Sequence, residues 1–182
     1  MAKTETAAAK KQLFVLVRPA PSDKSRALLQ IGSLTFPAAI GRTGRSAFKK
    51  EGDGRTPIST MRLLYGYHRA DRMSALKTAL PMIRTRKDML WCDAPDHAAY
   101  NCPVQAPFKA SHEEMMRQDS LYDVCLVLDW NITSRSRNRG SAIFMHLIRP
   151  GYQPTAGCIA LSPANMRRIL PLIKRGTRVR VI

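Results

Sequence analysis

Three absences narrow what this sequence can encode. It has no apolar run near the roughly 18 residues that a membrane-spanning helix requires, so no such span is expected. The early apolar stretch at residues 13–17 is shorter than the about 7–15 apolar residues of a secretion signal, so no signal peptide is expected in the chain as given. No two of the four cysteines have CxxC spacing, and no metal site is predicted. Cys92 and Cys102 could pair in an oxidising compartment, although their spacing does not require it.

Acidic residues are also missing from the last part of the chain. The protein carries a net charge of +17, and ten Lys and Arg residues follow Asp129, beyond which there is no carboxylate. A surface this basic favours a polyanionic partner, such as nucleic acid, an anionic membrane surface or an acidic cell-wall polymer. The simpler alternative is that many of these side chains only solvate the surface.

Length and composition fit one globular domain, because the 182 residues are 45% hydrophobic and only 24% charged. Residues 1–11 are interpreted as a polar leader and residues 12–182 as a single domain, with a loop-rich insertion around residues 69–119. A Gly-rich basic loop at residues 41–57 lacks the GK[ST] ending of a P-loop, so phosphate binding of that kind is not predicted.

Segments rich in branched and aromatic residues predict a mainly β fold with short helices. Residues 26–41 are typical of a hairpin that turns at Gly32 and Ser33. Further strands are expected at residues 12–17, 59–69, 121–131, 141–149, 158–162 and 177–182.

Two helix starts are predicted. Ser162 followed by Pro163 fits the first positions of a helix, which Pro171 should end or kink. Ser111, followed by two glutamates, fits a second helix start within the insertion, which is otherwise expected to consist of loops and short helices.

His146 and Cys158 are the clearest candidates for a reactive pair. His146 ends one predicted strand, and Cys158 follows Gly157 at the start of the next, with eleven residues between the two. A cysteine thiol needs a base to become the reactive thiolate, and histidine is the usual one. Gly157 permits close approach to the backbone and leaves N–H groups that can hold an oxyanion. The alternative is that both residues belong to the core.

The stretch HLIRPGYQPTAGCIAL, residues 146–161, resembles the active-site signature of the L,D-transpeptidases, which have a YkuD-like catalytic domain. EGDGRTP, WCDAPDHAAYN, SHEEM and LYDV resemble a short subgroup of that family, so the likeness extends from about residue 41 to residue 161. The resemblance implies a β-sandwich catalytic domain of the bacterial periplasm or cell envelope, acting on peptidoglycan stem peptides without metal or organic cofactor. A monomer is expected.

The resemblance also implies roles for individual residues. Cys158 would attack a stem-peptide carbonyl, His146 would act as base, and the N–H groups of Gly157 and Cys158 would hold the oxyanion. A backbone carbonyl usually orients the histidine, and Glu113 is an alternative. An amine acceptor gives a cross-link, whereas water would make the enzyme an L,D-carboxypeptidase. The candidate substrate contacts, whose alternative role is structural, are Trp91, Tyr100, Asn101, Ser111, His112, Glu113, Tyr122 and Thr155.

Two positions depart from the family pattern. Ala156 and Ala160 stand where most members have larger polar residues, and the loop between His146 and Cys158 is short. A smaller, less polar wall should change which donor carbonyl reaches the cysteine. We therefore expect an unusual linkage, from the first residue of one stem to the third of another.

The competing interpretation is a nucleic-acid-binding protein whose charge is its function. That class combines basic residues with exposed aromatic residues on one face. After Trp130, however, the chain contains only Phe144 and Tyr152 as aromatic residues, and it has no nucleic-acid-binding motif. No nucleic-acid partner is therefore expected.

Overall fold

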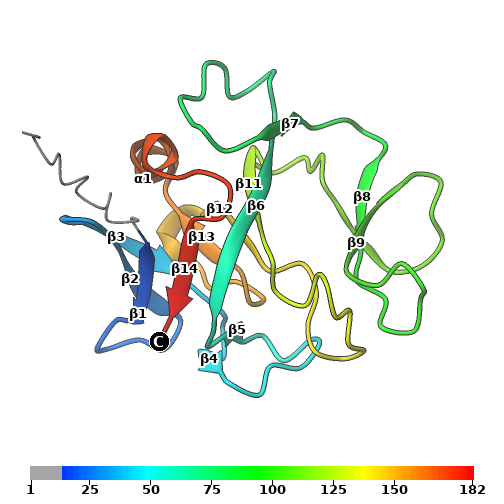
Figure 1. Cartoon of the computed structure of the whole chain (residues 1–182), viewed down its shortest axis with the longest axis horizontal. Helices are drawn as coiled ribbons and strands as arrows, with labels where there is room; N and C mark the ends of the chain where they lie inside the picture. Colours follow the sequence, from blue (N-terminus) through cyan, green and yellow to red (C-terminus); the bar gives the residue numbers. More distant parts are fainter. Residues whose placement is uncertain (1–13) are drawn as a thin grey trace, which may run out of the picture.

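The computed structural model describes residues 14–182, and strands dominate its regular structure (Figure 1). The polar leader predicted at residues 1–11 and the start of the strand predicted at residues 12–17 lie outside the described residues. The strands are β1 (Val15–Pro19), β2 (Arg26–Ile31), β3 (Leu34–Ala39), β4 (Arg45–Ser46), β5 (Thr56–Pro57), β6 (Thr60–His68), β7 (Met82–Arg84), β8 (Met89–Cys92), β9 (Cys102–Gln105), β10 (His112–Glu114), β11 (Val124–Leu128), β12 (Phe144–Leu147), β13 (Ile159–Leu161) and β14 (Arg178–Val181). The helices are α1 (Pro163–Ile169) and the 3-10 helices η1 (Pro150–Tyr152) and η2 (Leu170–Leu172).

Nine strands form one sheet that closes on itself. Their order is β11-β12-β13-β3-β2-β1-β14-β6-β7, and β11 also pairs with β6. Eight strands therefore form a ring, while β7 pairs with the last residues of β6. The two sides of this ring enclose one apolar core, to which nearly every strand contributes. The mainly β fold is confirmed, and the two layers expected from the resemblance belong to one continuous sheet.

Local sequence signals account for the hairpin and the helix. β2 and β3 pair with Ile31 opposite Leu34, so Gly32 and Ser33 form the two-residue turn, and Gly32 has a φ of +56°. The helix α1 starts as predicted, with the Asn165 N–H donating to the Ser162 hydroxyl at 3.2 Å. The α-helix ends before Pro171, which lies in η2.

Strands β11 and β12 are buried on both faces, and this decides where a site can form. Along β12, Met145 and Leu147 face the core inside the ring, whereas Phe144 packs in a second apolar cluster on the outer face. That outer cluster includes Trp91, Met115 and Tyr122, which all belong to the middle segment, the part of the chain between β7 and β11. The middle segment thus covers one outer face of the ring, and the space between them can hold a ligand.

The middle segment differs from the prediction of loops and short helices. Strands β8, β9 and β10 form a small antiparallel sheet in order β10-β8-β9, set to one side of the main ring (Figure 1). The helix start predicted at Ser111 is wrong: residues His112–Glu114 form β10, in which Glu113 pairs opposite Trp91. Backbone pairing with β8 and complete burial of the following Met115 override the local capping signal.

Cys92 and Cys102 lie directly opposite each other in the β8–β9 pair. Both thiols are free in the structure.

Candidate active site

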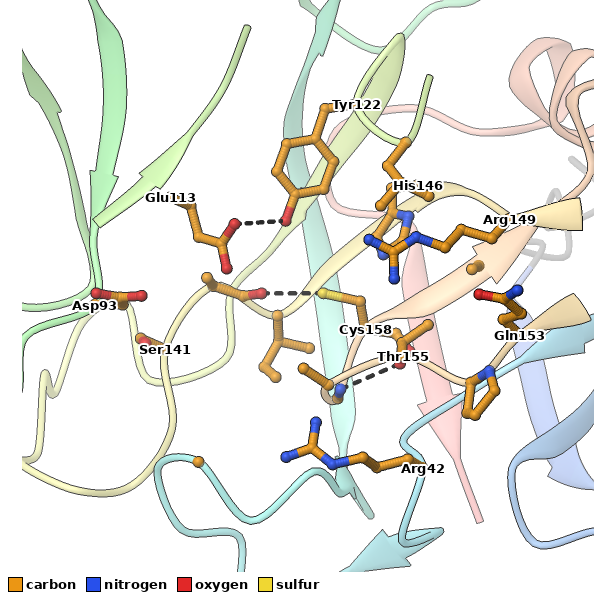
Figure 2. A pocket seen from close by; sticks show the side chains of 18 of the residues that line it. Arg42, Asp93, Glu113, Tyr122, Ser141, His146, Arg149, Gln153, Thr155 and Cys158 are labelled. Carbon is orange, nitrogen blue, oxygen red and sulfur yellow. Dashed lines mark hydrogen bonds between the residues drawn. The ribbon is translucent and has the colours of Figure 1, made fainter. Parts of the chain in front are cut away.

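A cavity of about 510 Å³ opens between the outer face of β12 and the middle segment. Cys158 and His146 lie on its wall, with charged side chains around them (Figure 2). The lining residues come from four parts of the chain: the Gly-rich loop, the middle segment, residues 141–143 and the loop before Cys158.

Strand register brings the two candidate residues together. β12 and β13 are parallel neighbours, with His146 aligned with Ala160. Side chains alternate along a strand, so Cys158, two residues before Ala160, lies on the same face as His146. His146 is 6% exposed and Cys158 is 8% exposed. The register therefore places an imidazole and a thiol diagonally adjacent on the cavity wall.

Hydrogen bonds fix the resting form of both groups. The Nδ1–H of His146 donates to the Leu147 carbonyl at 2.7 Å, because a carbonyl can only accept. This leaves Nε2 as the only basic atom of the neutral ring. The Cys158 thiol donates to the Ala142 carbonyl at 3.1 Å, and the Phe144 N–H donates to Sγ at 3.3 Å. Glu113, the alternative orienting group, instead accepts from the Tyr122 hydroxyl at 3.3 Å.

Burial keeps both groups uncharged at neutral pH. It raises the pKa of Cys158 to about 12, and the Phe144 N–H offsets this only in part. Burial also lowers the pKa of His146 to about 4; the Leu147 hydrogen bond opposes the shift, whereas the positive charges of Arg117 and Arg149 add to it. The resting pair is therefore a neutral thiol and a neutral imidazole, and thiolate formation requires proton transfer during the reaction.

A second cysteine also neighbours His146. Cys125 lies directly opposite His146 in the antiparallel β11–β12 pair. Its side chain is fully buried, and burial raises the pKa of its thiol well above the ordinary value. Only Cys158 reaches the cavity wall, so accessibility selects it as the candidate nucleophile.

Thr155 and Gly157 build the turn that presents Cys158. The Thr155 hydroxyl donates to the Cys158 carbonyl at 2.7 Å and accepts from the Gly157 N–H at 3.1 Å. The Thr56 hydroxyl donates to the Gly157 carbonyl at 2.8 Å. A Cβ on Gly157 would lie 2.8 Å from the Arg55 carbonyl oxygen. The space that the missing Cβ leaves at Gly157 is thus filled by the backbone of Arg55.

We expect Gly157→Ala to lower stability and to displace Cys158. Gly157 has a φ of +148°, so alanine would add backbone strain of about 1–3 kcal/mol to the clash with Arg55. Thermal unfolding measures the loss. Gly151→Ala is the matched control, because Gly151 has a φ of +74° with open space around its Cβ position. Equal losses for the two variants would show that the contact with Arg55 contributes nothing.

The candidate substrate contacts divide into two groups. Glu113, Tyr122 and Thr155 line the cavity. The other five lie elsewhere: Trp91 and Tyr100 are buried in packing, Asn101 is fully buried, Ser111 is exposed, and His112 lines a separate depression beside Phe108.

Several cavity residues were missed by sequence reasoning. Asp93 and Ser141 line it on one side, and Arg149 and Gln153 lie opposite them, with Arg42 below in the view of Figure 2. Glu51 also lines the cavity and accepts a hydrogen bond from the Ser141 hydroxyl. Glu51 and Asp93 fall inside two of the stretches that carry the family resemblance, EGDGRTP and WCDAPDHAAYN, which was the available signal. Arg149 and Gln153 likewise fall inside HLIRPGYQPTAGCIAL, whereas Arg42 is a single polar residue in the Gly-rich loop that no spacing distinguishes.

The burial of His146 predicts a pH-dependent stability. Its pKa is about 4 when folded and returns to its ordinary value of 6.5 when unfolded, so the unfolded state binds more protons between these values. The free energy of unfolding should fall by about 3 kcal/mol from this group as pH decreases from about 6.5 to about 4, with no contribution above that window. Urea unfolding of wild type and His146→Gln at pH 5 and pH 7.5 isolates the effect. A variant with the wild-type pH dependence would contradict it.

The described residues contain neither a membrane-crossing helix nor a metal-binding cluster. No helix within residues 14–182 is long and apolar enough to cross a membrane. The same residues contain no group of three or more His, Cys, Asp or Glu side chains placed to hold a metal ion.

Comparison with known proteins identifies the family. The sequence profile of YkuD, the L,D-transpeptidase catalytic domain, matches residues 22–181. The chain therefore belongs to the L,D-transpeptidase catalytic domain family, whose members act on peptidoglycan peptides.

Comparisons with solved structures and with curated proteins add less to this identification than the family profile does. The crystal structure of Mycobacterium tuberculosis L,D-transpeptidase 1 superposes with a TM-score of 0.40 at 12% sequence identity; the match covers 93% of this chain and 62% of that one. No curated protein matches the sequence.

Proposed function

We propose that the protein is a peptidoglycan L,D-transpeptidase that cross-links stem peptides through an acyl-enzyme on Cys158. The observation that carries this proposal is the placement of Cys158 and His146 on one face of neighbouring strands, at the wall of the cavity. A buried thiol beside a basic imidazole nitrogen is the arrangement that acyl transfer through a thioester needs.

The reaction begins from the neutral pair. As Cys158 attacks the donor carbonyl and the C–S bond forms, Nε2 of His146 takes the thiol proton. The C–N bond then breaks, and His146 returns that proton to the leaving amine. An amine of a second stem then attacks the thioester: the new C–N bond forms, the C–S bond breaks, and the proton lost by the amine passes through His146 to the Cys158 sulfur. The Leu147 carbonyl keeps Nδ1 protonated throughout, which holds Nε2 in its basic form.

Backbone N–H groups of Gly157 and Cys158 are proposed to hold the oxyanion. The Gly157 N–H now donates to the neutral Thr155 hydroxyl at 3.1 Å. A negatively charged oxygen is a stronger acceptor than a hydroxyl, so it can take over or share this donor. Such a donor contributes about 10²–10³ in rate in comparable sites.

The charges around the cavity suit a zwitterionic stem peptide. Asp93 and Glu113 lie on one wall; the Oδ1 atom of Asp93 is buried, with no hydrogen-bond partner among the described residues. Burial raises the pKa of Glu113, Arg117 opposes this shift, and the negative charge of Asp93 reinforces it. An acceptor ammonium group would stabilise both carboxylates. Arg42 and Arg149, which also line the cavity, can receive a donor carboxylate.

We further propose that the donor carbonyl belongs to the first residue of the stem, L-Ala, which gives a first-to-third linkage. Ala156 and Ala160 both line the cavity beside Cys158, and neither side chain is larger than a methyl group. If most members carry larger polar residues at these two positions, as the resemblance implies, the wall near the nucleophile is smaller and less polar here.

Incubation with purified muropeptides, followed by tandem mass spectrometry of the products, tests both proposals. Cross-linked dimers that form with wild type and not with Cys158→Ala support the transpeptidase. Shortened monomers alone would indicate the L,D-carboxypeptidase alternative. Only third-to-third dimers, formed with release of D-Ala from a tetrapeptide donor, would contradict the proposed linkage and leave the transpeptidase intact.

We also propose that the protein works in the periplasm or cell envelope, as a monomer whose basic surface contacts the anionic wall. This follows from the family's substrate and from the net charge of +17.

A further inference from the structure

Asn101 lies outside the cavity but contacts the backbone segment that holds the Cys158 thiol. Its side chain is fully buried and makes three hydrogen bonds. Oδ1 accepts from the Trp91 Nε1–H at 3.1 Å and from the Ala142 N–H at 3.0 Å, and Nδ2 donates to the Trp130 carbonyl at 3.0 Å. Because every one of these partners can only donate or only accept, the orientation of the carboxamide is fixed.

The Ala142 peptide needs such support. Ala142 has a φ of +50°, which is an unfavourable conformation for a residue with a Cβ. Its N–H is bound by Asn101, and its carbonyl accepts the hydrogen bond of the Cys158 thiol at 3.1 Å. The preceding Ser141 is held separately, through its hydroxyl, by Glu51 at 2.8 Å. A single residue, Ala142, therefore connects Asn101 to the sulfur, and its backbone is held in an uncommon conformation.

We infer that Asn101 is a positioning residue for Cys158, which aims the Ala142 carbonyl at the thiol and so fixes the orientation of the sulfur. Together with the Phe144 N–H, this carbonyl holds Sγ between one acceptor and one donor. Asn101 lies at the end of the connection between β8, which carries Trp91, and β9. This connection thereby acts on the nucleophile from outside the cavity. As a role in turnover, the inference rests on the proposed function; as a role in thiol geometry, it does not.

Removing the carboxamide should affect two properties in opposite directions. A hydrogen bond from the neutral thiol to a fixed carbonyl favours the neutral form, so its loss should lower the pKa of Cys158 and speed alkylation. Loss of orientation should instead slow turnover, because a displacement of about 1 Å at a reacting atom can cost about 10²-fold. Asn101→Gly is the appropriate variant, since glycine tolerates the φ of +58° that asparagine adopts there.

The experiment measures iodoacetamide alkylation of Cys158 against pH, by peptide mass spectrometry, together with muropeptide turnover. For Asn101→Gly we expect the alkylation midpoint to move to lower pH and kcat to fall by roughly 10- to 100-fold, with KM little changed. Asn101→Asp keeps an accepting oxygen for the Ala142 N–H and adds a negative charge, so its midpoint should stay at or above that of wild type.

Asn138→Gly is the matched control. Asn138 also has a left-handed backbone, with a φ of +61°, but it lies in an exposed loop. Its backbone carbonyl accepts from the Glu51 N–H at 2.9 Å, a hydrogen bond that glycine keeps. It should match wild type in both measurements. An unchanged midpoint in Asn101→Gly, or equal shifts in Asn101→Gly and Asn138→Gly, would overturn the inference.

Two further outcomes separate the alternatives. If Asn101→Gly does not fold, amide hydrogen exchange of wild type decides: the Ala142 N–H should be protected as strongly as the neighbouring strand amides, and rapid exchange would overturn the inference. If wild type shows no muropeptide turnover but the alkylation midpoint still shifts, the proposed function fails and the positioning role of Asn101 stands.

Discussion

Cys158→Ala should abolish acyl-enzyme formation and cross-linking while leaving the fold intact. Alanine has no nucleophile, and the cavity offers no replacement thiol, since the three other cysteines do not line it. The substitution leaves the Phe144 N–H and the Ala142 carbonyl without their sulfur partner, so thermal stability should fall modestly while the fold stays intact. Mass spectrometry of the intact protein after exposure to muropeptides, or to a carbapenem that acylates cysteine, should show an adduct on wild type only.

Cys125→Ala provides the decisive comparison for that result. Cys125 lies opposite His146 in the strand register, so it has the same potential base as Cys158 and differs mainly in access. We expect this variant to form the adduct at close to the wild-type rate. If Cys158→Ala still formed an adduct and the double variant Cys125→Ala/Cys158→Ala did not, Cys125 would be the nucleophile. That result would refute the proposed mechanism.

His146→Ala should slow acylation by a carbapenem by about 10²–10⁴-fold, the range that a positioned general base contributes. The effect should be large because burial raises the pKa of Cys158 to about 12, so little thiolate forms without a base. The rate of adduct formation, followed by mass spectrometry at a fixed pH of about 7.5, gives the measurement.

A matched variant separates loss of the base from loss of packing. His146 packs edge-on against the Tyr122 ring, with centroids 5.4 Å apart, and His146→Gln fills part of that space without a comparable base. It should be as slow as His146→Ala. Equal acylation rates in wild type, His146→Ala and His146→Gln would show that His146 has only a structural role. Raising the pH should then not speed acylation of the variants relative to wild type.

Much of the fold could be predicted from local sequence. Alternating and branched residues give strands, and Gly32–Ser33 and Ser162–Pro163 are adjacent-residue signals whose geometry needs no distant partner. Ser111 failed as a helix start for the opposite reason. Its segment joins β8 through backbone hydrogen bonds to residues about twenty positions away, and local propensity cannot report such a partner.

The sequence by itself determined the chemistry of the candidate pair: a thiol after a glycine, a histidine separated from it by eleven residues, and the family to which that pattern belongs. Only the tertiary structure decided which groups surround the pair. Register aligns His146 with Ala160 and so brings Cys158 to the same face, and closure of the ring lets the middle segment cover that face. Asn101 and Arg149 acquire their places in this way, because the contacts that define them join residues far apart in the chain, and spacing carries no record of such contacts.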